Sequence, residues 1–215
     1  KFLLLIFVLQ FFSQGCTRNM EIKKLVSYPE NYEKKSNKKW PLILFLHGIG
    51  ERGDNNELQL KYVDKVFLNQ NNYTNFQSVV VFPQAPLDDN WSSRLLTKNN
   101  IRQVFPENEK PTKSLQLVIK LMDSLVKEDF IDNKRVYLSG LSNGAMGSFE
   151  LLKNRPNMFA SAVIICGGGN PLWAKEFAKS TPVWIAHGSD DIDVHHSLSL
   201  NMADESIKYG GIPKL

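Results

Sequence analysis

The sequence predicts an α/β protein in which a mostly parallel sheet carries helices on both faces. Short apolar runs alternate with longer amphipathic stretches from residue 20 onward, the order expected of strands joined by helical crossovers. Two of these runs, 41–46 and 78–82, are almost continuously apolar, which is typical of strands buried on both sides. Neither an internal repeat nor a polar linker divides the chain, so we expect a single domain over residues 16–215.

Composition excludes several classes of protein. Hydrophobic residues make up 42% and charged residues 22% of the chain, which excludes disordered, collagen-like and coiled-coil proteins. The net charge of +4 is spread thinly, so no nucleic-acid partner is expected. The two cysteines, Cys16 and Cys166, exclude a disulfide framework, and Cys166 is expected in a buried strand. No spacing typical of zinc ligands occurs, and we expect neither a metal nor an organic cofactor.

Residues 1–15 are expected to be a secretory signal peptide. A lysine precedes the apolar run 2–9, which is shorter than the about 20 residues that a membrane-spanning helix needs. The stretch Ser13-Gln14-Gly15-Cys16 resembles a bacterial lipobox, although Ser13 stands where leucine is usual. The sequence therefore predicts a protein secreted across the bacterial inner membrane, periplasmic or anchored to the outer membrane through lipidated Cys16. An ordinary cleaved signal is the alternative.

The elements of the domain follow from local patterns. Pro29 ends a first, edge-type strand, and the lysine-rich stretch 33–39 is a solvated connector. Leu115, Val118 and Met122 recur at helical spacing. Strands are expected at 22–28, 41–46, 78–82, 135–139, 162–166 and 182–186, and helices at about 114–128, 144–154 and 197–209.

The segment Gly140-Leu141-Ser142-Asn143-Gly144 lies between a predicted strand and a predicted helix. In this context a G-x-S-x-G sequence is typical of a tight turn that holds a nucleophilic serine outward at the carboxyl edge of a sheet. The helix dipole beneath Ser142 would favour the negative charge that develops during acyl transfer. The alternative is a glycine-rich turn in which the serine only caps the helix.

A second glycine-rich segment, His47-Gly48-Ile49-Gly50, follows the apolar strand 41–46. Glycines leave the backbone open, so its N–H groups can bind an oxyanion. The backbone N–H groups of Ile49 and Asn143 are therefore the expected oxyanion hole. The alternative for this segment is a flexible turn.

A third cluster follows the strand expected at 182–186 and contains Asp190, Asp191 and Asp193. A serine nucleophile needs a base, and the base needs an orienting carboxylate. In proteins with this kind of turn, the serine, the acid and the histidine follow in that order along the chain. An acid at the end of a later strand fits this order. Any of the three aspartates could instead be an ordinary turn or cap residue.

These motifs together resemble the α/β-hydrolase fold, and within it the bacterial esterase and "predicted peptidase" group related to phospholipase/carboxylesterases and feruloyl esterases. The resemblance implies that Asp191, four residues after the second His-Gly histidine, is the acid. It also suggests that Trp91 lines the acyl pocket, with core packing as an equal alternative. It rests on PLILFLHGIGERGD (41–54), FPQAP (82–86) with Trp91, GLSNG (140–144), ICGGG (165–169) and PVWIAHG (182–188).

The catalytic histidine of that group comes some tens of residues after the acid, and none of the four histidines here lies there. His47 and His187 are expected to position loops, while His195 and His196 would have to turn back toward Ser142. Because the chain begins at Lys1 rather than methionine, we expect a fragment whose domain lacks its last strand and helix and whose base lies beyond Leu215. An inactive complete chain is the alternative.

The resemblance implies a serine hydrolase that cleaves a small-molecule or polysaccharide-linked carboxylic ester through an acyl-enzyme on Ser142. A serine peptidase of the same fold is the alternative enzyme, less favoured because an ester's alkoxide leaves without the protonation that an amine requires. From a different class, the alternative is a non-catalytic binding protein of the cell envelope that keeps the pocket without the base.

Overall fold

The structure is a computed structural model, and it describes residues 21–29, 32–33, 37–68, 77–96 and 103–215. The expected signal peptide and Cys16 lie outside the described residues. No helix in the described part of the chain is long and apolar enough to cross a membrane.

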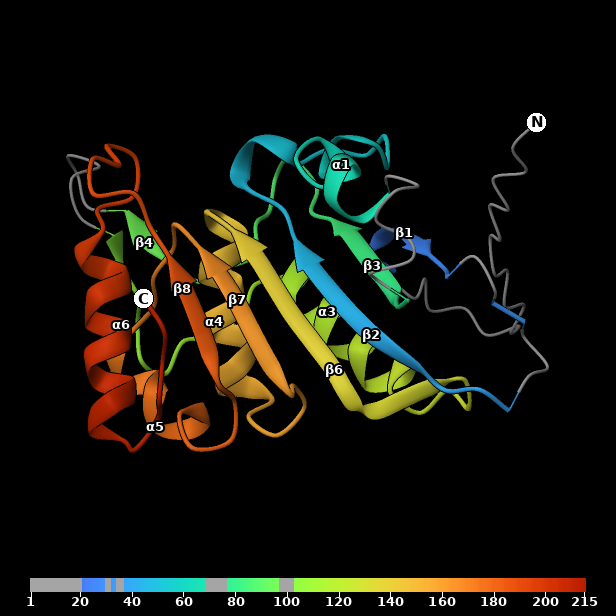
Figure 1. The fold of residues 1–215 in the computed structure, drawn as a ribbon. Coiled ribbons are helices and arrows are strands. Elements are labelled where there is room, and N and C mark those ends of the chain that lie inside the picture. Colours follow the sequence, from blue (N-terminus) through green and yellow to red (C-terminus); the bar gives the residue numbers. More distant parts are fainter. Residues whose placement is uncertain (1–20, 30–31, 34–36, 69–76, 97–102) are drawn as a thin grey trace.

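A six-stranded sheet in the order β1-β3-β2-β6-β7-β8 forms the centre of the domain (Figure 1). Only β1 runs antiparallel to its neighbour, and the other pairs are parallel. This confirms the mostly parallel sheet and places the carboxyl ends of β2, β6, β7 and β8 side by side at one edge. The strands are β1 (Lys23–Ser27), β2 (Trp40–Leu46), β3 (Val79–Gln84), β6 (Ile131–Leu141), β7 (Ser161–Ile165) and β8 (Val183–Ala186).

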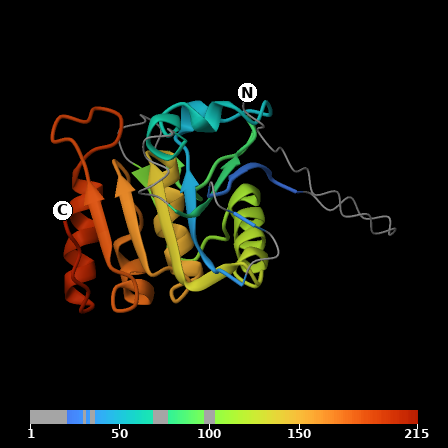
Figure 2. The same ribbon diagram turned by 45° about the vertical axis from the view of Figure 1, so that its right-hand side comes forward.

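The longer helices cover one face of this sheet (Figures 1 and 2). Alternate strand residues, such as Leu42, Leu44 and Val81, pack with the buried side chains of these helices in one large core. Thr112 caps the first of them by accepting a hydrogen bond from the Leu115 N–H. These longer helices are α3 (Lys113–Leu125), α4 (Asn143–Asn154) and α6 (Ser197–Lys208), and the short helix α5 (Ala174–Phe177) contacts α4 and α6.

The opposite face is covered over β2 and β3 by the chain between them. The intervening strand residues, including Ile43, Phe45 and Phe82, form a second core with Val63. Leu60 and Phe67, from the short elements of this connection, pack against that core. Period-two alternation thus divides β2 and β3 between two cores, which explains their continuous apolar sequence. The connecting elements are the 3₁₀ helices η1 (Ile49–Glu51) and η2 (Leu58–Leu60) and the helix α1 (Asp64–Phe67).

Within the described residues, the sequence missed only short elements and one strand extension. The short elements carry no hydrophobic period long enough to detect: η1, η2, α1, α5, the 3₁₀ helix η3 (Pro171–Trp173) and the two-stranded sheet β4 (Leu95–Leu96) with β5 (Gln103–Val104). β6 begins at Ile131 rather than at residue 135, because Ile131 pairs with Trp40 although the residues between are polar.

The outer edge of β8 is partly paired by the C-terminal segment. Ile185 N donates to Lys214 O at 2.8 Å, and Lys214 N donates to Val183 O at 2.9 Å, in a parallel bridge. Trp184, between the two, remains 58% exposed on the uncovered part of the sheet face. Lys214 therefore pairs with part of the β8 edge that no strand of the sheet covers.

Helix α4 approaches the end of β2 so closely that only glycine fits at the contact. A Cβ on Gly144 would lie 2.0 Å from Leu46 O, and one on Gly140 would lie 2.4 Å from Gly144 O. Contacts below 3 Å force a backbone to shift. The two glycines therefore allow the helix to begin directly over the carboxyl edge of the sheet.

We expect Gly144→Ala to lower the free energy of unfolding by about 2 kcal/mol or more, because the added methyl overlaps backbone that cannot move away. Gly188→Ala is the matched control, since a Cβ there meets nothing within 4 Å. Urea unfolding of both variants measures the difference. Equal stability of the two would contradict the packing described for α4.

Candidate active site

Ser142 occupies the strained turn between β6 and α4. Its φ of 54° and ψ of −116° lie in a region that residues other than glycine rarely adopt. The backbone on each side holds it, since Ser142 N donates to Ile165 O at 2.9 Å and Met146 N donates to Ser142 O at 3.0 Å. Its side chain does not cap the helix, so the capping alternative is wrong. The hydroxyl stands at the edge of the sheet with no hydrogen-bond partner among the described residues.

The expected oxyanion residues lie on both sides of this serine. A Cβ on Gly48 would be 3.7 Å from the Ser142 Cβ, which places the segment after β2 directly against the turn. Ile49 is the first residue of η1, and Asn143 is the first residue of α4. Because each opens a helix, its N–H has no acceptor within that helix. Both groups are available to bind a negative oxygen at the serine.

His47 fastens the segment after β2 to the segment after β3. Its Nε2 accepts from Ala85 N at 3.0 Å, so Nδ1 carries the proton and donates to Gly48 O at 2.6 Å. The pKa of His47 is lowered to about 4, chiefly by burial. The hydrogen bond to the Gly48 carbonyl opposes this shift, and the nearby Arg52 charge contributes to it. His47 is therefore a neutral positioning residue with both ring nitrogens in use, as the sequence predicts.

Trp91 is completely buried and joins the segment after β2 to the first residue of α4. Its backbone N–H donates to Asn143 Oδ1 at 3.0 Å, and its indole N–H donates to His47 O at 3.0 Å. A Cβ on Gly147 would lie 2.5 Å from the Trp91 Cβ, so the tryptophan packs directly on α4. Of the two roles left open by the sequence, the structure shows the packing role.

Arg52 is a positioning residue that sequence reasoning missed. Its Nε donates to Ile49 O at 2.9 Å, and its Nη1 donates to Leu87 O at 2.9 Å and to Asp89 O at 3.3 Å. The guanidinium thus ties η1, which begins with Ile49, to the segment after β3. Only its place directly after the glycine-rich segment could have indicated this role.

Among the three candidate acids, Asp191 alone is fixed in place by the backbone. Its Oδ1 accepts from Val194 N at 2.9 Å and from Asp193 N at 3.0 Å, and its Oδ2 lies 3.4 Å from His187 Nε2. The Val194 N–H is the main cause that lowers the pKa of Asp191, so the carboxylate is ionised. Asp190 and Asp193 are exposed. The geometry favours Asp191.

His187 holds the acid loop rather than the serine. Its Nδ1 lies 2.7 Å from Ser199 Oγ, which itself donates to Gly167 O, and its Nε2 lies 2.8 Å from Val194 O. His195 and His196 stack on each other with ring centroids 4.5 Å apart. All four histidines of the chain are described, and none makes a hydrogen bond to Ser142.

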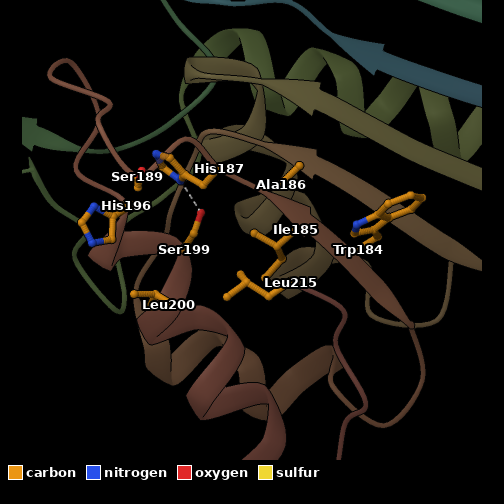
Figure 3. A pocket seen from close by; sticks show the side chains of 9 residues that line it. All are labelled: Trp184, Ile185, Ala186, His187, Ser189, His196, Ser199, Leu200 and Leu215. Atoms are coloured by element: carbon orange, nitrogen blue, oxygen red, sulfur yellow. Dashed lines mark hydrogen bonds between the residues drawn. The ribbon is translucent and has the colours of Figure 1, made fainter.

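Figure 3 shows a hollow beside this loop that does not contain the serine. It has a volume of about 360 Å³ and lies between β8 and α6. The drawn hydrogen bond between His187 and Ser199 closes one side of it. Its lining residues are Trp184, Ile185, Ala186, His187, Ser189, His196, Ser199, Leu200 and Leu215.

Cys166 differs from the sequence expectation of a buried strand residue. β7 ends at Ile165, and Cys166 turns out of the sheet with a φ of 43°, half-buried. Burial and the Asp191 charge raise the pKa of its thiol, while the Ser142 backbone N–H lowers it. A protonated thiol therefore lies between the serine turn and the acid loop. Its position at the end of β7, next to β6 in the sheet, was not evident before the strand order was known.

Comparison with known proteins supports the assignment of the fold. Residues 29–209 match the family described as Phospholipase/Carboxylesterase. The chain belongs to the Phospholipase/Carboxylesterase family. Its structure is similar to the crystal structure of a thermostable esterase, with a TM-score of 0.76 and 32% identity. That similarity covers 89% of this chain and 49% of the other, so the chain spans about half the length of that esterase.

Two further proteins are similar to this chain, one in sequence and the other in fold alone. XynS20E, a bifunctional acetylxylan esterase/xylanase from Neocallimastix patriciarum, is 38% identical over 80 residues, which are 37% of this chain and 12% of that protein. Est1E from Butyrivibrio proteoclasticus shares the fold, with a TM-score of 0.58 at 13% identity, over 90% of this chain and 88% of the other. The α/β-hydrolase fold and the esterase resemblance expected from the motifs are confirmed.

The buried imidazole predicts a specific dependence of stability on pH. The folded pKa of His47, about 4, lies below the ordinary value of 6.5, so the unfolded chain binds this proton first as the pH falls. We expect the wild type to lose about 3 kcal/mol more unfolding free energy than His47→Gln between pH 7 and pH 4. Urea unfolding across this range measures it, and parallel curves would contradict a neutral His47.

Proposed function

We propose that the protein is a serine esterase that cleaves carboxylic esters through an acyl-enzyme on Ser142. The observation that carries the proposal is the backbone of Ser142, strained at φ 54° and ψ −116° with a side chain that caps nothing. Such strain costs free energy and persists where function requires the geometry. The similarity to a thermostable esterase at 32% identity supports the same reaction.

The residues around the serine supply the parts of an acyl-transfer reaction. Ser142 Oγ attacks the ester carbonyl, and its proton passes to a base. The N–H groups of Ile49 and Asn143, with the N-terminus of α4, stabilise the oxyanion of the tetrahedral intermediate. The alkoxide then leaves, and water attacks the acyl-enzyme to release the acid and restore the serine.

In this proposal Asp191 orients the base and stabilises the positive charge that the base gains when it takes the serine proton. Two backbone N–H groups fix its Oδ1, and the loop places its charge close enough to Cys166 to raise the pKa of the thiol beside Ser142. His47 and His187 use both ring nitrogens elsewhere. Within these 215 residues, only His195 and His196 therefore remain as candidates for the base.

The substrate class follows from the ease of the leaving step. An ester's alkoxide leaves without the protonation that an amine requires, so an ester demands less of the base than a peptide does. The named activities of XynS20E and the thermostable esterase favour a small or polysaccharide-linked ester. Lipid anchoring of Cys16 would hold the enzyme at the cell envelope, where such esters are met.

We expect Ser142→Ala to lower kcat for p-nitrophenyl acetate by roughly a thousandfold or more, because the members of a catalytic triad act as a unit. A fluorophosphonate probe should label the wild-type full-length protein and leave this variant unlabelled. Ser180→Ala is the control, since Ser180 is exposed just before β8 begins, at the end of the strands away from Ser142. Undiminished turnover in Ser142→Ala would refute the nucleophile, and no labelling of the wild type would favour a non-catalytic binding protein.

We expect Asp191→Asn to lose most activity, whereas Asp193→Asn, its matched control in the same loop, stays within about tenfold of the wild type. Only the Asp191 carboxylate is fixed by the backbone, and the Asp193 side chain is exposed. Initial rates of ester hydrolysis measure both variants. A larger loss at Asp193 would show that the other aspartate orients the base.

A further inference from the structure

We propose that Arg94 and Arg52 form a subsite for an anionic group, so that the ester cleaved at Ser142 carries a carboxylate. This anion subsite, defined by the two guanidinium groups, rests on the proposed esterase function and adds the class of substrate. The subsite requires three things. Both arginines must lie close to the serine, no carboxylate among the described residues may neutralise their charges, and some of their N–H groups must lack an acceptor.

Arg94 lies about one helical turn from the nucleophile. Its Nη1 is 3.6 Å from Met146 Sδ, and the Met146 N–H is bonded to Ser142 O at 3.0 Å. The chain reaches this point directly after Trp91, whose N–H bonds Asn143. The segment 91–94 therefore runs along α4, with Trp91 against its first residue and Arg94 against Met146.

The charge of Arg94 is left without an anion. The guanidinium is half-buried, and no carboxylate in the described ranges lies within ion-pair distance of it. A thioether sulfur is a weak acceptor, and a guanidinium stays protonated at any physiological pH. Partial removal of an unpaired charge from water costs free energy that nothing described in the protein offsets.

Glu150, a buried acid of α4, is committed to another role. Glu150 Oε2 accepts from the Ser93 backbone N–H at 2.9 Å, and no ion pair joins Glu150 to Arg94. Burial is the main cause that raises the pKa of Glu150, which favours its neutral form. Glu150 therefore positions the segment before Arg94 and does not balance its charge.

Arg52 brings a second uncompensated cation to the same region. Its Nε and Nη1 bind three backbone carbonyls, which carry no net charge. Arg52 Nη1 binds Leu87 O and Asp89 O, in the same segment that leads to Arg94. Burial is the main cause that lowers the pKa of Arg94, and the Arg52 charge adds to it. Arg52 Nη2 and the Nε and Nη2 of Arg94 make no hydrogen bond to any residue that the structure describes.

A carboxylate satisfies all of these features at once. Its two oxygens match the parallel N–H groups of a guanidinium, and its charge removes the repulsion between the arginines. A neutral ester leaves both cations unpaired. The subsite therefore selects esters with a carboxylate on the acyl or the alcohol part.

The experiment compares two pairs of esters that differ in one negative charge. On the alcohol side these are 4-acetoxybenzoate and methyl 4-acetoxybenzoate, and on the acyl side 4-nitrophenyl hydrogen glutarate and 4-nitrophenyl pentanoate. In the full-length protein, Arg94→Gln should lower the charged-to-neutral ratio of kcat/KM about tenfold or more in at least one pair. Arg135→Gln is the matched control, since Arg135 pairs with Asp132 near the start of β6, at the end of the strands away from Ser142.

A binding measurement separates this inference from the proposed function. By calorimetry on the Ser142→Ala protein, 4-hydroxybenzoate or glutarate should bind about tenfold more weakly when Arg94→Gln is added. If both ratios and both affinities are unchanged by Arg94→Gln, the anion subsite is refuted while the esterase proposal stands. Anion binding that depends on Arg94 in a protein without ester turnover would instead refute the esterase and retain the subsite.

Discussion

The candidate site depends on the contact between the first turn of α4 and the end of β2. Because Gly144 lies against Leu46 O, the helix begins directly at the carboxyl edge of the sheet. The chain then has a single residue, Ser142, in which to turn from β6 into α4, and its φ of 54° is the cost. A larger side chain at Gly140 or Gly144 would move the helix away, and with it the Asn143 N–H and the positive end of the helix dipole.

A set of buried polar contacts holds the segments around this turn. His47 joins the ends of β2 and β3, and Trp91 joins His47 to Asn143. Arg52 adds three backbone carbonyls to the same set. The segments that carry the proposed oxyanion groups, the Ile49 and Asn143 N–H, are therefore held in place before any ligand binds, as preorganised donors must be. The cost is that His47, although close to the serine, is not free to act as a base.

The sheet order separates the charges around Ser142. β7 and β8 lie on one side of β6 and lead to the acid loop with Asp191, whereas β2 and β3 lie on the other and lead to Arg52 and Arg94. A carboxylate that orients a base thus lies opposite two unpaired cations. In the two proposals, proton transfer therefore takes place on one side of the serine and recognition of a negative substrate on the other.

Local sequence was sufficient to predict the sheet, the principal helices and the turn at Ser142, because hydrophobic period and glycine spacing act over a few neighbouring residues. It also singled out the Ile49 and Asn143 N–H groups, and it narrowed the acid to a cluster of three aspartates. The family resemblance selected Asp191 among them. Only the tertiary structure showed how the backbone holds the Asp191 carboxylate, buried Trp91, and brought Cys166 to the serine turn and Arg94 to α4. These contacts join residues far apart in sequence, so they depend on strand order and packing that no local pattern contains.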